Sequence, residues 1–191
     1  KNPTLCLKRL STLRGFEFID PGFSPDWKLL SRLEKSVLKF KKDRFYSVKD
    51  WSGVYFLAFF AQASQQQGKY YAKEFHFTKE ELFCLSGLKD LPDIIQKLHL
   101  PKLLPSEIYE ILDPVDLEII YFIRVITSVS IVTSRIDNFL KKWRNVSLQI
   151  TGEDLKDLGL KPGREMGVLL HTLLLSKIDG KIQSNQDEIA L

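Results

Sequence analysis

Apolar side chains recur along most of the chain at intervals of three and four residues, which is the spacing of one face of an α-helix. The stretch 24–42 illustrates the pattern, with an apolar face made of Leu30, Leu33, Val37 and Phe40. Similar faces predict helices in nearly every part of the sequence, about nine or ten in all. We therefore expect an all-α protein in which a multi-helix body passes into a smaller helical tail.

Short polar signals predict where several of these helices begin. Ser24 is followed by Pro and Asp, and a capping hydroxyl before Pro favours a helix start. Thr78 begins a capping box, Ser47 begins a similar motif, and Ser106 is expected to cap the helix that follows it. The polar tract 65–68 is expected to end the helix that starts near Ser47.

The most apolar run, Val115–Val132, is rich in Ile, Val and Thr, so propensity alone favours strands there. We predict a pair of buried helices instead, because the surrounding sequence is helical and propensity is a weak guide. The run also contains Asp116, Glu118 and Arg124, and three charges in so short a segment argue against a membrane span.

The chain has 191 residues, enough for one large domain or for two small domains that share a core. No repeat, low-complexity segment or Gly-rich hinge divides it. We expect a helical body domain over 1–112 and a helical tail domain over 113–191.

Residues 151–178 carry the most specific pattern in the sequence. Two short helices are predicted on either side of a tight turn. The apolar side chains expected to pack across this turn are Leu155, Leu158, Leu160, Met166, Leu170 and Leu173. Gly159 suits a helix C-cap with positive φ, a conformation that only Gly adopts without strain.

Pro162 and Gly163 are expected to open the second of these helices, so that its free backbone N–H groups point outward beside Lys161 and Arg164. A helix N-terminus flanked by cations attracts anions such as phosphate. A plain helical hairpin with a solvated turn is the alternative explanation of the same residues.

The net charge is only +4, but the charges are spread unevenly. Residues 1–50 hold 12 basic and 6 acidic side chains, a balance compatible with a polyanionic partner. Five of these cations recur at helical spacing: Lys28, Arg32, Lys35, Lys39 and Lys42. This stripe is either the solvated face of a helix or a surface that contacts phosphates.

No catalytic residue and no metal ligand is predicted. A nucleotide polymerase needs a close pair of acids after Gly-Ser to bind two metal ions, and the sequence has no such pattern. His76, His99 and His171 are isolated from other ligand residues. Cys6 and Cys84 form no disulfide framework, which indicates a reducing, cytoplasmic location. Because the sequence begins without Met or a signal peptide, we expect a portion of a longer chain.

Several motifs resemble those of bacterial class II tRNA nucleotidyltransferases, the CCA-adding and A-adding enzymes and the related poly(A) polymerases. The tail motif of that family is similar to Thr151–Leu155 together with Leu158–Gly163 and Gly167, and its usual ending is similar to Ser176–Glu188. Its body motifs are similar to Leu7–Leu10, Phe16–Pro21, Trp51–Ala58 and Pro105–Leu112. This chain has Arg164 where the family often has a second Pro.

The resemblance implies the C-terminal body and tail of such an enzyme. The catalytic head and neck would lie upstream or in another chain, and Mg²⁺ with ATP or CTP would bind there, leaving no cofactor in this chain. Body and tail would hold the acceptor stem and the TΨC loop of tRNA while the head adds CCA, CC or A to the 3′ end. Such binding reads the RNA backbone and weakens with salt.

The residues expected to contact RNA lie first at the tail turn and around it: Lys161, Gly163, Arg164, Lys141, Lys142, Arg144, Thr151, Lys177 and Lys181. The basic stripe supplies a second set: Arg32, Lys35, Lys39 and Lys42. Two other hypotheses remain open from the sequence. The chain is alternatively a protein-interaction module that docks a separate catalytic subunit, or an independent enzyme with a dispersed site.

Overall fold

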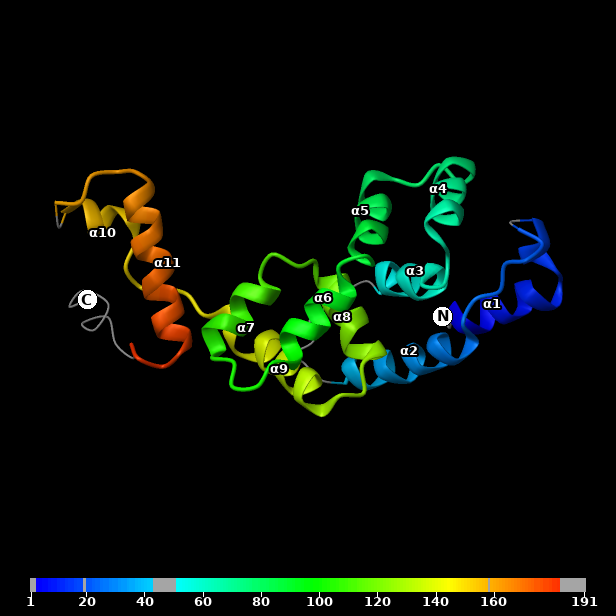
Figure 1. Ribbon diagram of the computed structural model, residues 1–191, viewed down its shortest axis with the longest axis horizontal. Helices are drawn as coiled ribbons and strands as arrows, with labels where there is room; N and C mark the ends of the chain where they lie inside the picture. Colours follow the sequence, from blue (N-terminus) through cyan, green and yellow to red (C-terminus); the bar gives the residue numbers. More distant parts are fainter. Residues whose placement is uncertain (1–2, 19, 43–50, 158, 183–191) are drawn as a thin grey trace.

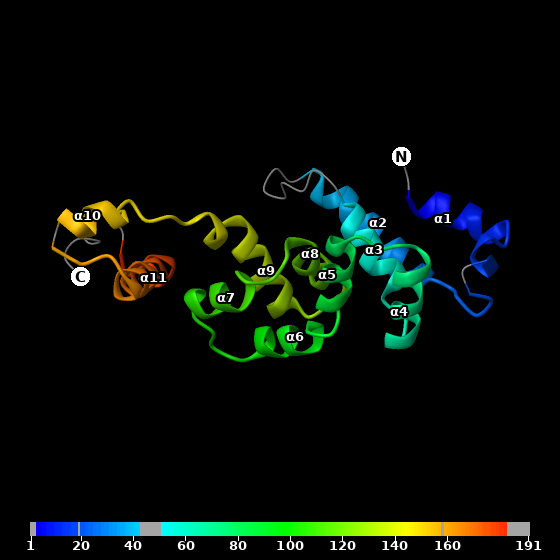
Figure 2. The same ribbon diagram turned by 90° about the horizontal axis from the view of Figure 1, so that it is seen from above.

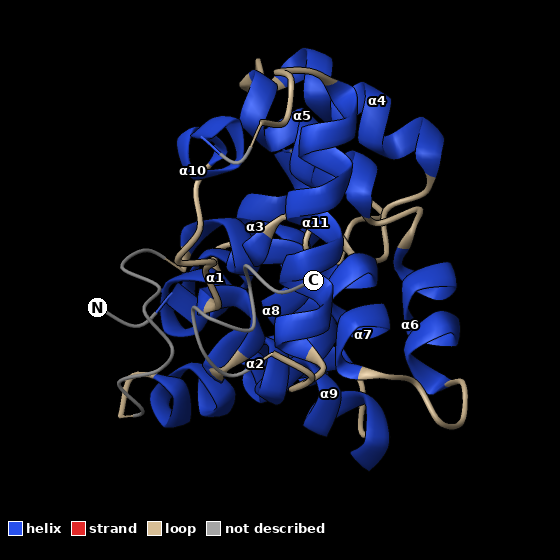
Figure 3. Ribbon diagram, turned by 90° about the vertical axis from the view of Figure 1, so that its left-hand side faces the viewer, coloured by secondary structure: helices blue, strands red, loops and turns tan. Residues whose placement is uncertain are grey.

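The structure is a computed structural model that describes residues 3–18, 20–42, 51–157 and 159–182. In these residues it contains eleven α-helices, two short 3₁₀ helices and no strand (Figure 3), which confirms the predicted all-α class. The α-helices are α1 (Pro3–Thr12), α2 (Trp27–Phe40), α3 (Ser52–Phe60), α4 (Gln65–Glu74), α5 (Lys79–Gly87), α6 (Leu91–His99), α7 (Pro105–Leu112), α8 (Leu117–Ile126), α9 (Ser130–Lys141), α10 (Gly152–Asp157) and α11 (Arg164–Ile178). The 3₁₀ helices are η1 (Gly15–Phe18) and η2 (Trp143–Asn145).

The helices are arranged along one axis in an elongated molecule (Figure 1). Helices α1 to α5 occupy one end, α6 to α9 the middle, and α10 with α11 the other end. Among the described helices, none is long and apolar enough to cross a membrane.

Local capping explains several helix starts, and it corrects two of the predicted ones. Thr78 and Glu81 form the predicted capping box at α5. Helix α2 is capped by Asp26 and not by Ser24, because the Asp26 carboxylate accepts bonds from two backbone N–H groups of the first turn. The polar tract 65–68, predicted to end a helix, instead begins α4 behind a capping box at Ser64. The predicted start at Ser47 lies outside the described residues.

The start of α7 also differs from the prediction. Its N-cap is Leu104, whose backbone N–H donates to the Glu107 carboxylate at 2.7 Å. Ser106, predicted to be the cap, is the second residue of the helix and is buried. Its backbone N–H and its hydroxyl donate instead to the carboxylate of Asp179, far along the chain.

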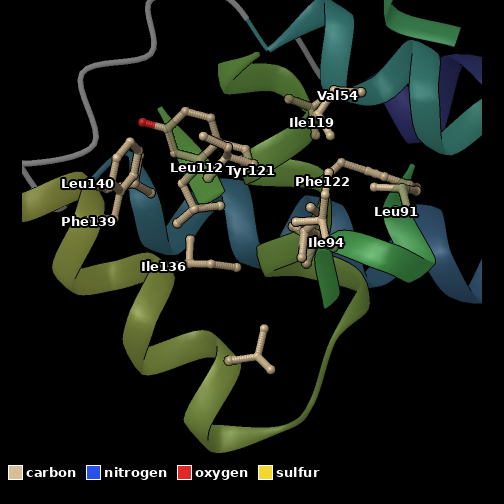
Figure 4. Close-up of a cluster of buried hydrophobic side chains, with 14 of the residues drawn as sticks. Val54, Leu91, Ile94, Leu112, Ile119, Tyr121, Phe122, Ile136, Phe139 and Leu140 are labelled. Carbon is tan, nitrogen blue, oxygen red and sulfur yellow. The ribbon is translucent and has the colours of Figure 1, made fainter. Parts of the chain in front are cut away.

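The larger of two hydrophobic cores lies under α2, α3 and α6 to α9 (Figure 4). Helix α8 runs through its centre, and Tyr121, Phe122 and Ile123 are each at most 2% exposed. The apolar run 115–132 forms the buried helix α8 and the first residues of α9, and no strand, so the predicted helical structure is confirmed, although Val129 and Ile131 are exposed. Burial of its β-branched side chains on nearly every side outweighs their preference for strands.

Charged side chains close one edge of this core. The guanidinium of Arg124 in α8 donates two hydrogen bonds to the Asp137 carboxylate in α9, at 2.7 and 3.0 Å. It also lies over the Phe40 ring, 5.8 Å from the ring centroid. The paired bonds link α8 to α9, and the ring contact links it to α2.

A smaller core holds the other end of the molecule together. Its buried side chains are Ile150, Leu155, Met166, Leu173 and Ile182. The partly buried Leu160 and Leu170 pack against them, as predicted, while Leu158 lies outside the described residues. The two cores do not meet at one point of the chain, because Ile178 of α11 also packs in the larger core, and the domain boundary after residue 112 stays a prediction. Helices α8 and α9 lie beyond that residue and pack in the larger core.

A buried phenol connects the first helices to α4. The hydroxyl of Tyr71, which is fully buried, donates to the Asp20 carboxylate at 3.0 Å. The same carboxylate accepts from the Gln67 amide at 3.2 Å and from the Gly22 backbone N–H at 3.0 Å. These three donors hold the pKa of Asp20 below its usual value, with the Gly22 bond as the largest cause.

Candidate nucleic-acid interface

Helix α10 begins with a compact cap at Thr151. The Asp154 carboxylate accepts from both the backbone N–H and the hydroxyl of Thr151, each at 2.7 Å. These bonds lower the pKa of Asp154, the hydroxyl bond being the larger cause. The Thr151 hydroxyl is therefore already bonded to Asp154 within the cap, and its role in this structure is to hold the start of α10.

Gly159 ends α10 as the sequence predicts. Its φ is +93°, its N–H donates to the Lys156 carbonyl at 2.8 Å, and the Leu160 N–H donates to the Leu155 carbonyl at 3.0 Å. This pair of bonds is the Schellman motif, which turns the chain sharply and places Leu160 against Leu155. The turn that follows is thereby held close to the smaller core.

The turn itself presents backbone donors and cations. Helix α11 begins at Arg164, and its first intrahelical bond is made by the Gly167 N–H, so the three preceding N–H groups have no partner within the helix. Gly163 has extended backbone, with φ 164°, and apart from its chain neighbours no atom lies within 4 Å of where a β-carbon would be. Lys161 and Arg164 are exposed, and neither forms an ion pair with another described residue. Glu165, in the first turn of α11, adds one negative charge beside these two cations.

A second group of cations lies where α9 ends. Lys142 and Arg144 are exposed, and Lys141 is half-buried. Burial raises the pKa of Tyr121, whereas the nearby Arg144 acts in the opposite direction. These cations also stand near the negative end of the α9 dipole, so they stabilise the helix whether or not an anion binds.

Two of the predicted cations lie at the far end of α11. Lys177 is half-buried, and Lys181 is exposed. The Lys181 ammonium lies 3.4 Å from the Asp179 carboxylate. Lys181 is therefore paired within the protein, which makes it a weaker candidate for a phosphate contact than Lys161 or Arg164.

Side chains of the basic stripe surround a shallow groove on the surface of α2. The groove is lined by Lys28, Arg32, Lys35, Ser36 and Lys39. The Arg32 guanidinium donates to the Thr127 carbonyl at 3.0 Å, which fixes this side chain against the loop between α8 and α9. Lys35, Lys39 and Lys42 are exposed.

The predicted contact residues thus fall into separate groups and not into one pocket. The α10–α11 turn lies at one end of the elongated molecule (Figure 1). Figure 2 shows that α2, η2 with the segment after it, and α10 follow one long edge, while α6 and α7 follow the opposite edge. This arrangement suits an extended polyanion that runs along an edge and ends at the turn.

The sequence does not single out one polar contact that shapes the site. Asp179 accepts two hydrogen bonds from Ser106, across a separation of 73 residues. The contact carries no local signal because it depends on how α11 packs on α7. In the part of the chain that the structure describes, no group of three or more His, Cys, Asp and Glu side chains is placed to hold a metal ion.

The fold defines an all-α protein of known architecture. Three solved structures share it over the whole length of this chain, and all are CCA-adding enzymes. The enzyme from Thermotoga maritima in complex with tRNA has a TM-score of 0.73 and 16% identity. A CCA-adding enzyme in complex with ATP has a TM-score of 0.71 and 18% identity, and one in complex with CTP has 0.71 and 19%.

These matches agree with the family resemblance of the motifs, at the level of the fold. They cover 99–100% of this chain but only 45–47% of the solved chains, so the chain spans about half the length of the enzymes it matches. No family model matches the sequence, and no curated protein matches it either.

Proposed function

We propose that this chain is the RNA-holding part of a tRNA nucleotidyltransferase. The observation that carries the proposal is the likeness of its whole length to about half of several CCA-adding enzymes, one of them in complex with tRNA. The separate groups of exposed cations support it, because a folded RNA offers phosphates over a long surface.

In this proposal the α10–α11 turn binds the backbone of the TΨC loop. Lys161 and Arg164 supply charge, and the free N–H groups at the start of α11 donate to a phosphate oxygen. The open space around Gly163 allows the RNA backbone to come close to the chain. The cations of α9, η2 and α2 then face the acceptor and T stems along the edge.

The chain itself performs no chemistry in this proposal. A head and neck, upstream or in another chain, would bind Mg²⁺ with ATP or CTP and add CCA, CC or A to the RNA 3′ end. The body and tail would contribute by fixing where that end lies, since holding a reactant in place supplies a large share of a rate enhancement.

A salt titration of binding to a tRNA transcript that lacks its 3′ CCA tests the proposal. Affinity is expected to fall steadily as salt rises. The double variant Lys161→Gln with Arg164→Gln is expected to bind about tenfold more weakly, with a salt slope shallower by about 2. The control removes the same charge from the opposite edge, through Lys89→Gln with Lys102→Gln on either side of α6.

Two results would contradict the proposal. One is binding that does not respond to salt. The other is an equal loss of affinity in the two double variants, which would mean that the turn has no special part in binding.

A second candidate, docking to a separate catalytic chain, is favoured by exposed apolar side chains near the start of the molecule. Leu13 is 76% exposed and Phe18 is 91% exposed. Leu13→Ser with Phe18→Ser is expected to leave tRNA binding unchanged and to weaken association with a separately supplied head and neck. Unchanged association would refute this candidate.

A further inference from the structure

The carboxylate of Asp179, at the end of α11, joins that helix to α7 in the middle of the molecule (Figure 1) through one pair of hydrogen bonds. It accepts from the backbone N–H of Ser106 at 2.9 Å and from the Ser106 hydroxyl at 3.0 Å. The N–H of Ser106 belongs to the first turn of α7 and so has no partner within that helix. Asp179, from the end of α11, therefore supplies the cap that α7 lacks in its own sequence.

Both residues of this contact are largely shielded from solvent, and the chain beyond Asp179 is held in a fixed turn. The Asp179 side chain is 7% exposed, and Ser106 is also 7% exposed. Beyond Asp179 the chain turns through Gly180, whose φ is +77°, in a second Schellman motif closed by a 2.9 Å bond from the Lys181 N–H to the Ser176 carbonyl. That turn returns Ile182 to the smaller core.

Helix α11 is shared between the two cores. Met166 and Leu173 pack in the smaller core, while Ile178 packs in the larger one. Its far end carries Arg164 and the turn. A helix of this length is roughly 22 Å long, so a tilt of about 10° at Asp179 would move Arg164 by about 4 Å. A displacement of that size exceeds what a hydrogen bond tolerates.

We propose that Asp179 is a positioning residue. Through Ser106 it fixes α11 on α7, so that the α10–α11 turn and the cations of α2, α9 and η2 engage one RNA together. This inference rests on the proposed function. Asp179 acts through geometry, because two linked binding surfaces strengthen each other only when both can reach the RNA at once.

The test compares two RNAs on the whole chain. A short hairpin that carries the TΨC loop on a truncated T stem reaches only the tail, whereas an acceptor–T-arm minihelix reaches both the tail and the cations of the body. Asp179→Ala removes both acceptor oxygens that bond to Ser106. It is expected to bind the minihelix at least tenfold more weakly and the hairpin with unchanged affinity. Ser106→Ala, which leaves the backbone donor, is expected to show a smaller loss of the same kind.

Asp157→Ala is the matched control, because it removes one exposed acidic side chain from the same end of the molecule. It is expected to leave the difference between the two RNAs as it is in the unsubstituted chain. Far-ultraviolet circular dichroism of each variant checks that the helices are retained.

The outcomes separate the two proposals. If the hairpin fails to bind the unsubstituted chain, the proposed tail contact is refuted. If the hairpin binds but Asp179→Ala and Asp157→Ala behave alike on the minihelix, the positioning role is refuted while the proposed function stands. An equal loss on both RNAs would show that Asp179 only keeps the tail folded, which also overturns the positioning role.

Discussion

The guanidinium of Arg135 in α9 donates a hydrogen bond to the backbone carbonyl of Leu98, at 2.6 Å, where α6 ends. The same nitrogen lies 2.6 Å from the Leu100 carbonyl. Arg135 is 9% exposed, so a positive charge is buried against the carbonyl end of a helix. The carbonyl groups of a helix end need partners, and this side chain supplies one from another helix.

Removing this partner is expected to destabilise the protein. Arg135→Met keeps the length of the side chain but leaves the buried Leu98 carbonyl and the part-buried Leu100 carbonyl without this donor, at a cost of about 2 kcal/mol in the free energy of unfolding. Chemical denaturation measures it. Arg144→Met removes an exposed guanidinium and is expected to change stability by less than about 0.5 kcal/mol. Equal stability of the two variants would contradict the capping role.

The two glycines of the tail turn are expected to respond differently to alanine. Gly159 has a φ of +93°, and Gly163 has extended backbone at 164°. Neither glycine has another atom within 4 Å of an added methyl group, so only the backbone differs. Gly159→Ala is expected to destabilise the protein by about 1 kcal/mol, and Gly163→Ala to be neutral, in thermal denaturation. The reverse order would be inconsistent with the Schellman motif at Gly159.

Tyr71 is expected to make stability fall at alkaline pH. Burial, followed by the bond to Asp20, raises its pKa from 10.0 to about 12. A raised pKa favours the neutral phenol in the folded state. Its contribution to stability is therefore complete below pH 10 and is lost as the pH rises towards 12. Unfolding free energies measured at pH 9 and pH 11 are expected to differ more in the unsubstituted chain than in Tyr71→Phe. Identical slopes would argue against this account.

The pair formed by Arg124 and Asp137 is expected to need a guanidinium and not merely a cation. Lysine offers one ammonium in place of two parallel donors and stacks less well on an aromatic ring. Arg124→Lys is expected to lower the free energy of unfolding by about 1 kcal/mol. Arg14→Lys, in a pair whose arginine is 81% exposed, serves as the control and is expected to be neutral.

Local signals predicted the parts of this fold that depend on nearby residues. The capping box at Thr78 and the C-cap at Gly159 involve residues within a few positions of each other. The helical pair over 115–132 was predicted against strand propensity. The structure explains it through burial in the middle of a helical core.

The contacts that escaped prediction join distant parts of the chain. Serine is a residue type that often caps helices, yet the hydroxyl of Ser106 donates to the Asp179 carboxylate, 73 residues away. Asp26 replaces Ser24 as a cap because its carboxylate reaches two N–H groups at 2.9 Å. The cations were identified as a type from the sequence, but their distribution over an end and an edge follows only from the packing of the helices.

The elongated arrangement of the helices leaves a large surface in contact with solvent. The chain exposes 12450 Å² of surface. A compact protein of its mass, 22.1 kDa, would expose about 9,300 Å². Less of the surface is thus withdrawn from water than in a rounded domain of equal size. A ligand that covers the long edge raises the melting temperature by mass action, so occupancy and folding are coupled in this molecule.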